Sequence, residues 1–137
     1  MTTEAIPQTV GEIMTSPVLT VFPWEDARNA ARVMDSRHVR HLPVIDESRR
    51  LVGVLSYRSV LHVLATAGKL ETQVGELMHR RPQFVSSATT CLDAIEFMRS
   101  QHHGCLPVVD RGRLVGIVTA ADFVGASAGL LDRWLRE

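Results

Sequence analysis

The stretch that decides the fold reads HVRHLPVID at residues 38–46 and RLVGVLS at residues 50–56. It returns as HHGCLPVVD at residues 102–110 and RLVGIVT at residues 113–119. Each copy has two short β-branched runs around a charged turn, a pattern that predicts two paired strands. A glycine inside a strand marks a place where a ligand or another backbone comes close. Two such copies predict one fold built from two equivalent halves.

The repeat extends over nearly the whole chain. Met14 and Met78 are 64 positions apart, whereas Gly53 and Gly116 are 63 apart, so the first turn carries one extra residue. A period this regular is typical of a duplicated structural unit. We therefore expect a flexible tail at 1–9, one repeat at 10–67, a linker at 68–73, a second repeat at 74–126 and a helical tail at 127–137.

Both repeats carry the same order of predicted elements. A short helical turn at 10–14 or 74–78 precedes a proline-bearing loop and a brief strand at 18–21 or 83–85. A helix follows whose apolar residues recur at i, i+3, i+4 and i+7, as on a helix that covers a sheet. The two stripes are Ala27, Ala30, Ala31 and Met34, and Cys91, Ala94, Ile95 and Met98.

The predicted fold class is α/β (α+β), with two pseudo-symmetric β-α-β-β-α repeats. The hairpin strands are followed by closing helices at roughly 58–67 and 120–126. A half of about 55–65 residues is marginal as an independent core, so the two repeats are expected to pack into one module. In the C-terminal tail a small apolar stripe predicts either packing on the module itself or a surface for a partner.

Composition narrows the function classes. Fifteen basic and 15 acidic residues give no net charge, which argues against a large nonspecific nucleic-acid surface. No apolar run approaches the length of a membrane span, and no signal-peptide pattern opens the chain, so a cytoplasmic location is expected. Cys91 and Cys105 flank a predicted helix and would lie on the order of 20 Å apart, too far for a disulfide.

The ordered set of motifs resembles a tandem pair of CBS (cystathionine β-synthase) domains, known as a Bateman module. These motifs are G-E-[IL]-M, His-x-x-x-Leu-Pro-Val-[IV]-Asp and Gly-h-h-[ST] opening a helix, each present twice. The resemblance implies a stand-alone regulatory module that binds AMP, ADP, ATP or S-adenosylmethionine in the cleft between its repeats. It also implies a homodimer formed through helices, no enzymatic activity, no cofactor and an unknown regulated partner.

The resemblance carries site residues over to matching positions. The predicted stronger cleft consists of Ser16, Pro17, Val18, Arg40, His41, Pro43, Thr119 and Asp122. An aspartate there accepts the ribose hydroxyls, a threonine donates to a phosphate oxygen, and an arginine fork suits phosphate. The predicted weaker cleft consists of Arg80, Arg81, Pro82, Gly104, Cys105, Pro107, Ser56 and Ser59. It is expected to be weak because Ser59 replaces the aspartate.

Simpler interpretations of the same residues stay open. Thr119 and Asp122 suit the first turn of a helix, where they would act as caps. Arg40 could be a solvated cation near a helix C-terminus. The histidines lack a compact Cys/His set for zinc, and no nucleophile motif is present. A ligand-free dimerisation or adaptor module acting through its helical surfaces is the alternative function.

Overall fold

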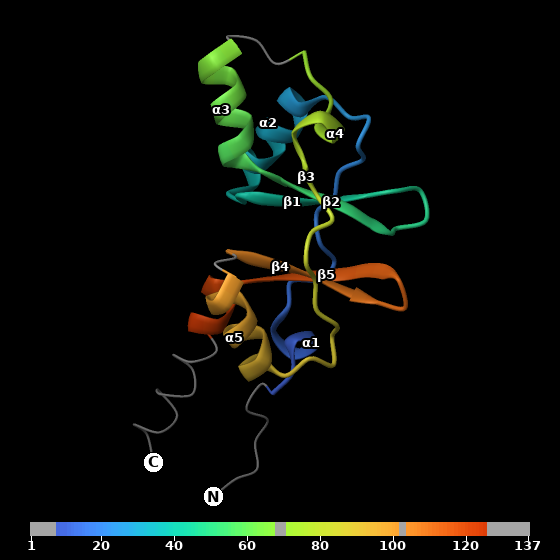
Figure 1. Ribbon diagram of the computed structural model, residues 1–137, viewed down its shortest axis with the longest axis vertical. Coiled ribbons are helices and arrows are strands. Elements are labelled where there is room, and N and C mark those ends of the chain that lie inside the picture. The colour runs from blue at the N-terminus through green and yellow to red at the C-terminus, as the bar shows by residue number, and fades with distance from the viewer. Residues whose placement is uncertain (1–7, 68–70, 102–103, 126–137) are drawn as a thin grey trace, which may run out of the picture. The chain divides into compact units, whose positions relative to one another are not determined.

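The computed structural model describes residues 8–67, 71–101 and 104–125, so most of both predicted tails lies outside the described residues. Figure 1 labels the elements. The helices are α1 (Val10–Ile13), α2 (Ala27–Arg37), α3 (Tyr57–Ala67), α4 (Val74–Leu77) and α5 (Cys91–Gln101), and residues 120–125 are also helical. The strands are β1 (His41–Ile45), β2 (Leu51–Ser56), β3 (His79–Arg80), β4 (Cys105–Asp110) and β5 (Arg113–Thr119).

The chain forms two compact units, and each draws on both sequence repeats. Unit 1 falls within residues 1–18, 83–111 and 115–137, and unit 2 within residues 19–82 and 112–114. The N-terminal segment of the first repeat thus belongs to the unit that holds most of the second repeat. The corresponding segment of the second repeat, with α4 and β3, belongs to unit 2. The compact units therefore cut across the predicted repeat boundaries.

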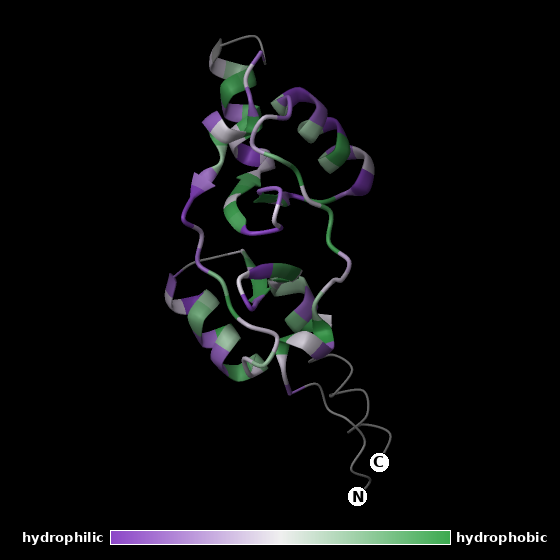
Figure 2. Ribbon diagram, turned by 90° about the vertical axis from the view of Figure 1, so that its right-hand side faces the viewer, coloured by the Kyte–Doolittle hydropathy of each residue, from purple (hydrophilic) through white to green (hydrophobic). Residues whose placement is uncertain are grey.

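Unit 2 is a three-stranded antiparallel sheet in the order β1-β2-β3. His41 lies opposite Ser56 and Val44 opposite Gly53, and a bulge follows at Val44/Ile45. Helices α2 and α3 contact each other on one side of this sheet (Figure 1). The Asp26 carboxylate caps α2 by accepting a 2.8 Å hydrogen bond from the Arg28 N–H. In Figure 2 the helices are banded green and purple, as expected of helices with one apolar and one polar face.

Unit 1 repeats this plan around the hairpin β4–β5, with α5 beside it (Figure 1). Arg111 and Gly112 at the turn have φ values of 51° and 78°, as a tight type I′ turn requires. In unit 1, Thr15 pairs with β5 in the same way that β3 pairs with β2 in unit 2. Its N–H donates to the Ile117 carbonyl at 2.9 Å, and the Ile117 N–H donates back at 3.2 Å.

Each unit has its own apolar core. The N-terminal segments that carry α1 and α4 belong to the unit that holds most of the other repeat, and we call them the exchanged segments. Each core includes a valine from one of them. Val10 of α1 is fully buried with Leu106, Val108 and Val118 in unit 1. Val74 of α4 is fully buried in the core of unit 2. The short helices are thus held by burial of a side chain, because four residues are too few for a helix to be stable alone.

The edge strands of the two sheets differ from the predicted ones. The strands expected at 18–21 and 83–85 are reduced to single parallel bridges, Val21 with Val44 and Val85 with Val108. Pro23 has no N–H to continue the ladder after Val21, which limits the first of them. Conversely, the loop expected after Met78 contains β3, whose Arg80 and His79 pair with Gly53 and Val54.

Three of the four positions of the predicted stripe are buried in the first copy and two of the four in the second. Ala27, Ala30 and Met34 are at most 3% exposed, while Ala31 is only partly buried. In α5, Ala94 and Met98 are buried and Cys91 is partly buried, but Ile95 is 38% exposed. The i+4 residue, Ala31 or Ile95, is the most exposed member of each stripe. The buried face of the helix is therefore narrower than the pattern predicts.

The strand glycines lie under methionine side chains. A Cβ atom built at Gly116 would lie 2.6 Å from the Met14 sulfur and 2.9 Å from the Thr15 carbonyl oxygen. At Gly53 the same atom would lie 2.6 Å from the Met78 sulfur. Both distances are too short for any side chain, so each glycine is required for the exchanged segment to lie on its strand.

We expect Gly116→Ala to lower the free energy of unfolding by about 1–3 kcal/mol, the usual cost of forcing an extra methyl group into a filled space. The Thr15 carbonyl cannot retreat without breaking its pairing with Ile117. Gly125→Ala is the control, since nothing lies within 4 Å of a Cβ there. Urea unfolding of the two variants checks this, and equal midpoints would contradict it.

Candidate functional site

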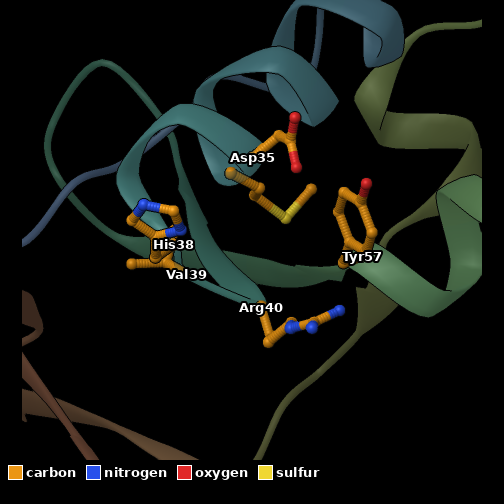
Figure 3. A pocket seen from close by; sticks show the side chains of 6 residues that line it. Asp35, His38, Val39, Arg40 and Tyr57 are labelled. Carbon is orange, nitrogen blue, oxygen red and sulfur yellow. The ribbon is translucent and has the colours of Figure 1, made fainter.

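Unit 2 carries a cavity of about 270 Å³ at the end of α2, beside the start of α3. The Arg40 guanidinium carbon lies 5.3 Å from the centroid of the Tyr57 ring, within the range of a cation–π contact. In Figure 3 the guanidinium lies below the ring, and Asp35 and His38 stand on the α2 side. The lining residues are Met34, Asp35, His38, Val39, Arg40 and Tyr57.

The backbone fixes the positions of Tyr57 and Arg40 in the cavity. The Tyr57 N–H donates to the Arg40 carbonyl at 2.9 Å, which joins the start of α3 to the residue before β1. His38 ends α2 in the left-handed conformation with φ 56°, and this reverses the chain toward Arg40. Arg40 is exposed, so its guanidinium is accessible to an anion while the ring restrains it.

His41 differs from its neighbour in charge. Its side chain is partly buried in β1, and burial lowers the pKa of the imidazole below its usual 6.5. Taking a charged group out of water disfavours the charged form, so His41 is neutral at neutral pH. Arg40 is therefore the cation of this pair.

Thr119 and Asp122 of the predicted stronger cleft lie at the end of β5. The Thr119 N–H donates to Asp122 Oδ2 at 2.7 Å, and the Thr119 hydroxyl donates to the same oxygen at 3.1 Å. This is the carboxylate half of a capping box at the start of the helix of residues 120–125. Within the described part of the chain, Oδ1 accepts no hydrogen bond. Capping therefore leaves one carboxylate oxygen free.

Ser16, Pro17 and Val18 follow directly from Thr15, which pairs with Ile117 of β5. Ser16 and Pro17 are exposed, Val18 is partly buried, and the peptide bond between Ser16 and Pro17 is cis. Because this bridge is antiparallel, the chain leaves Thr15 in the direction opposite to Thr119, which lies two residues beyond Ile117.

Three predicted contact residues are buried inside their units. Pro43 and Pro107 lie in the sheets, where their carbonyls accept 3.1 Å hydrogen bonds from Val21 and Val85. Cys105 is 9% exposed, and burial raises the pKa of its thiol to about 11. A thiol in that state is protonated at neutral pH and is not a nucleophile.

The residues of the predicted weaker cleft are also divided between the units. In unit 2, the Ser56 hydroxyl lies 2.8 Å from the Ser59 hydroxyl and accepts a 3.1 Å hydrogen bond from the Ser59 N–H, which caps α3. Arg80 is exposed and donates to the Gly75 carbonyl at 3.4 Å, Arg81 is exposed with φ 53°, and Pro82 is partly buried. In unit 1, Gly104 is exposed.

Sequence reasoning did not find Asp35, His38 or Tyr57 as cavity residues. Tyr57 lies between the predicted contacts Ser56 and Ser59, and no motif marks it as a cavity residue. Its position follows from the backbone hydrogen bond that joins the start of α3 to Arg40. Of the predicted stronger cleft, unit 1 holds Ser16, Pro17, Val18, Thr119 and Asp122, and unit 2 holds Arg40, His41 and Pro43.

The described residues contain no group of three His, Cys, Asp or Glu side chains that could hold a metal ion. None of the helices within those residues is long and apolar enough to cross a membrane.

Comparison with known proteins finds relatives and solved structures that contain CBS domains. The chain is 32% identical over 114 residues to the CBS domain-containing protein YhcV of Bacillus subtilis, covering 82% of this chain and 81% of that protein. Two solved structures superpose with TM-scores of 0.81. One is CBSX2 in complex with AMP, 32% identical, covering 89% of this chain and 97% of that chain; CBSX2 comes from Arabidopsis thaliana. The other is the CBS domain pair of MJ0100 with 5'-methylthioadenosine and S-adenosyl-L-methionine, 26% identical, covering 88% and 96%.

Other curated relatives are longer, and the chain spans only 13% to 43% of several of them, some of which are named as enzymes. The family model of the CBS domain matches twice, at residues 10–66 and 74–129. These two matches cover most of the chain and coincide with the duplicated motifs. The protein therefore belongs to the CBS domain family and carries a pair of these domains.

Proposed function

We propose that this protein is a regulatory module that senses an adenosine-containing metabolite, such as AMP, ADP, ATP or S-adenosylmethionine, and signals its occupancy to a partner in the cytoplasm. The observation that carries the proposal is the Arg40–Tyr57 pair lining an open cavity. Similarity to a CBS protein solved with AMP supports the choice of ligand.

In this assignment Arg40 is the phosphate contact. The planar guanidinium of Arg40 matches two phosphate oxygens at once and carries its charge at any physiological pH. The Tyr57 ring restricts the side chain before ligand arrives, which reduces the entropy lost on binding. Neutral His41 contributes shape and hydrogen bonding there instead of charge.

Asp122 is the proposed ribose contact. Asp122 Oδ2 is used by Thr119, which leaves Oδ1 to accept a hydrogen bond from a ribose hydroxyl. Capping and ligand binding are therefore compatible roles of one side chain. In unit 2 the matching position is Ser59, whose hydroxyl lies against Ser56, so we propose about one strong site per chain.

Catalysis forms no part of the proposal. Among the described residues, the two cysteines have thiols whose pKa is raised by burial, and neither forms a disulfide. A raised pKa keeps a thiol protonated and unreactive. Regulation by ligand occupancy requires binding, and Arg40, Tyr57 and Asp122 are the residues proposed to supply it.

We expect AMP to raise the thermal midpoint and to bind with about one site per chain, since a ligand that binds only the native state stabilises it. Asp122→Ala should weaken AMP and adenosine by about tenfold to a hundredfold, the range for a hydrogen bond to a charged group. Arg40→Ala should weaken AMP but not adenosine, because its proposed partner is the phosphate. Calorimetric titration measures all of these affinities.

Asp26→Ala is the matched control for Asp122→Ala. It removes the N-cap carboxylate of α2, whereas Asp122→Ala removes the capping-box carboxylate in the first turn of the helix of residues 120–125, and both variants should lose about 1 kcal/mol of stability. Only Asp122→Ala should lose ligand affinity. Equal AMP affinities in the two variants would show that Asp122 is a cap alone, and absence of binding to every adenosine compound would overturn the proposed function.

The lowered pKa of His41 predicts a pH dependence of stability. The unfolded chain binds a proton at about pH 6.5, whereas folded His41 resists it, so the stabilising effect is complete above pH 6.5 and declines as the pH falls further. His41→Gln should therefore lose less stability than the wild type between pH 7.5 and pH 5. Urea unfolding at both values tests this, with exposed His62→Gln as the control; identical losses in the wild type and His41→Gln would contradict it.

A second proposal concerns assembly, because apolar side chains remain exposed on the helices. Val33 of α2 and Leu61 and Leu64 of α3 are 39%, 44% and 44% exposed. Ala30 and Ala94 are buried in the unit cores and cannot form this surface. We propose that the α2–α3 surface joins two copies in a homodimer, which is also how a ligand-free adaptor would work.

We expect the wild type to sediment as a dimer at micromolar concentration and the double variant Leu61→Glu, Leu64→Glu to sediment as a monomer, because two charges would be buried unpaired at the contact. Leu92→Glu on α5, at a side chain that is 71% exposed, is the control and should remain dimeric. A monomeric wild type would exclude the dimer.

A further inference from the structure

The carboxylate of Asp110 spans from the end of β4 to the loop after Val85. The Ser87 N–H donates to Asp110 Oδ1 at 3.0 Å, and the Ser87 hydroxyl donates to Oδ2. These two hydrogen bonds from Ser87 lower the pKa of the Asp110 carboxyl. Both carboxylate oxygens are therefore used to hold one residue 23 positions away.

Ser87 in turn holds α1. Its carbonyl accepts a 2.9 Å hydrogen bond from the Gly11 N–H, and Thr89 accepts one from the Val10 N–H at 2.8 Å. A Cβ at Gly11 would lie 3.1 Å from both the Ser87 Cβ and its carbonyl oxygen, so the two backbones are in close contact. From α1 the chain runs directly through Thr15 to Ser16, Pro17 and Val18.

Unit 2 has the same backbone contact without the carboxylate. The Gly75 N–H donates to the Pro23 carbonyl at 2.8 Å, as Gly11 does to Ser87. Proline has neither an N–H nor a hydroxyl to offer a carboxylate. Asp46, the counterpart of Asp110, instead accepts hydrogen bonds within its own turn from the N–H groups of Ser48 and Arg50, at 2.8 and 2.9 Å.

Turn length explains why the two aspartates differ. The first turn carries the extra residue found in the sequence, and its backbone N–H groups point to Asp46. The second turn is the tight one at the left-handed residues Arg111 and Gly112. There the Asp110 carboxylate accepts its hydrogen bonds from Ser87 of the neighbouring loop. The difference is therefore built into the sequence at two places, the turn and position 87.

We propose that Asp110 is a positioning residue: through Ser87 it holds α1, and with α1 the segment that pairs with β5 at Thr15 and continues into Ser16, Pro17 and Val18. Its effect on ligand affinity rests on the proposed function, whereas its hold on α1 does not. Among the described residues of unit 2, Asp46 makes no such contact with Pro23, and the loop that holds α4 is closed locally by the Glu25 carboxylate, which accepts a 2.7 Å hydrogen bond from the Phe22 N–H.

Amide hydrogen exchange measured by NMR on the full chain separates these two parts. In Asp110→Asn the amides of Val10, Gly11 and Thr15 should exchange about tenfold faster or more, since hydrogen bonds to a charged group are lost. The amides of Val74 and Gly75 in unit 2 and of Val109 on β4, which donates to the Val85 carbonyl, should not change. Ser87→Ala should act like Asp110→Asn, Ser87→Thr should retain protection, and Asp46→Asn should leave α1 unaffected.

Affinity for AMP, titrated in the same variants, gives the second measurement. We expect Asp110→Asn and Ser87→Ala to bind AMP several-fold more weakly than the wild type, with Ser87→Thr and Asp46→Asn unchanged. Unchanged exchange at Gly11 in Asp110→Asn, or an equal increase at Val109, would overturn the positioning role. Faster exchange with full AMP affinity would show that α1 is held but the site does not need it. A wild type that binds no AMP defeats only the proposed function, because the exchange result still decides whether Asp110 holds α1.

Discussion

The close approach of a methionine to a strand glycine is the constraint on which both units depend. Met14 lies over Gly116 and Met78 over Gly53, and in each place there is no room for a Cβ atom. The approach lets the neighbouring backbone pair with the strand, through Thr15 in unit 1 and β3 in unit 2. Val10 and Val74 can then complete the two cores, and the residues proposed to contact ligand are placed at the strand ends.

Most of the fold could be predicted because the repeat, the helical stripes and the hairpins are local patterns. Both hairpins and the helices that carry the stripes lie where expected. The exchange of the segments that hold α1 and α4 could not be predicted, because Val10 and Val74 occupy equivalent places and either unit could accommodate either valine. β3 was missed for the same reason, since two residues between a methionine and a proline give no periodic signal.

The candidate site was predictable in its charges and less so in its neighbours. Arg40 and Asp122 were identified from motifs, and both are accessible at least in part. Burial of His41, Cys105 and Pro43 depends on side chains that approach from other elements, which no motif records. Capping and binding were expected to hold together at Asp122, and two carboxylate oxygens that can be used separately are compatible with both roles.

The exchanged segments also bear on how such a chain could have arisen. A single repeat of this topology carries a short helix whose valine is buried only in the unit that contains the other repeat's hairpin. An ancestor with one repeat would therefore have needed two molecules that traded their N-terminal arms, which is a domain swap. Gene duplication then places both partners on one polypeptide, so that their encounter no longer depends on protein concentration and the two copies are free to diverge, as positions 23 and 87 have done.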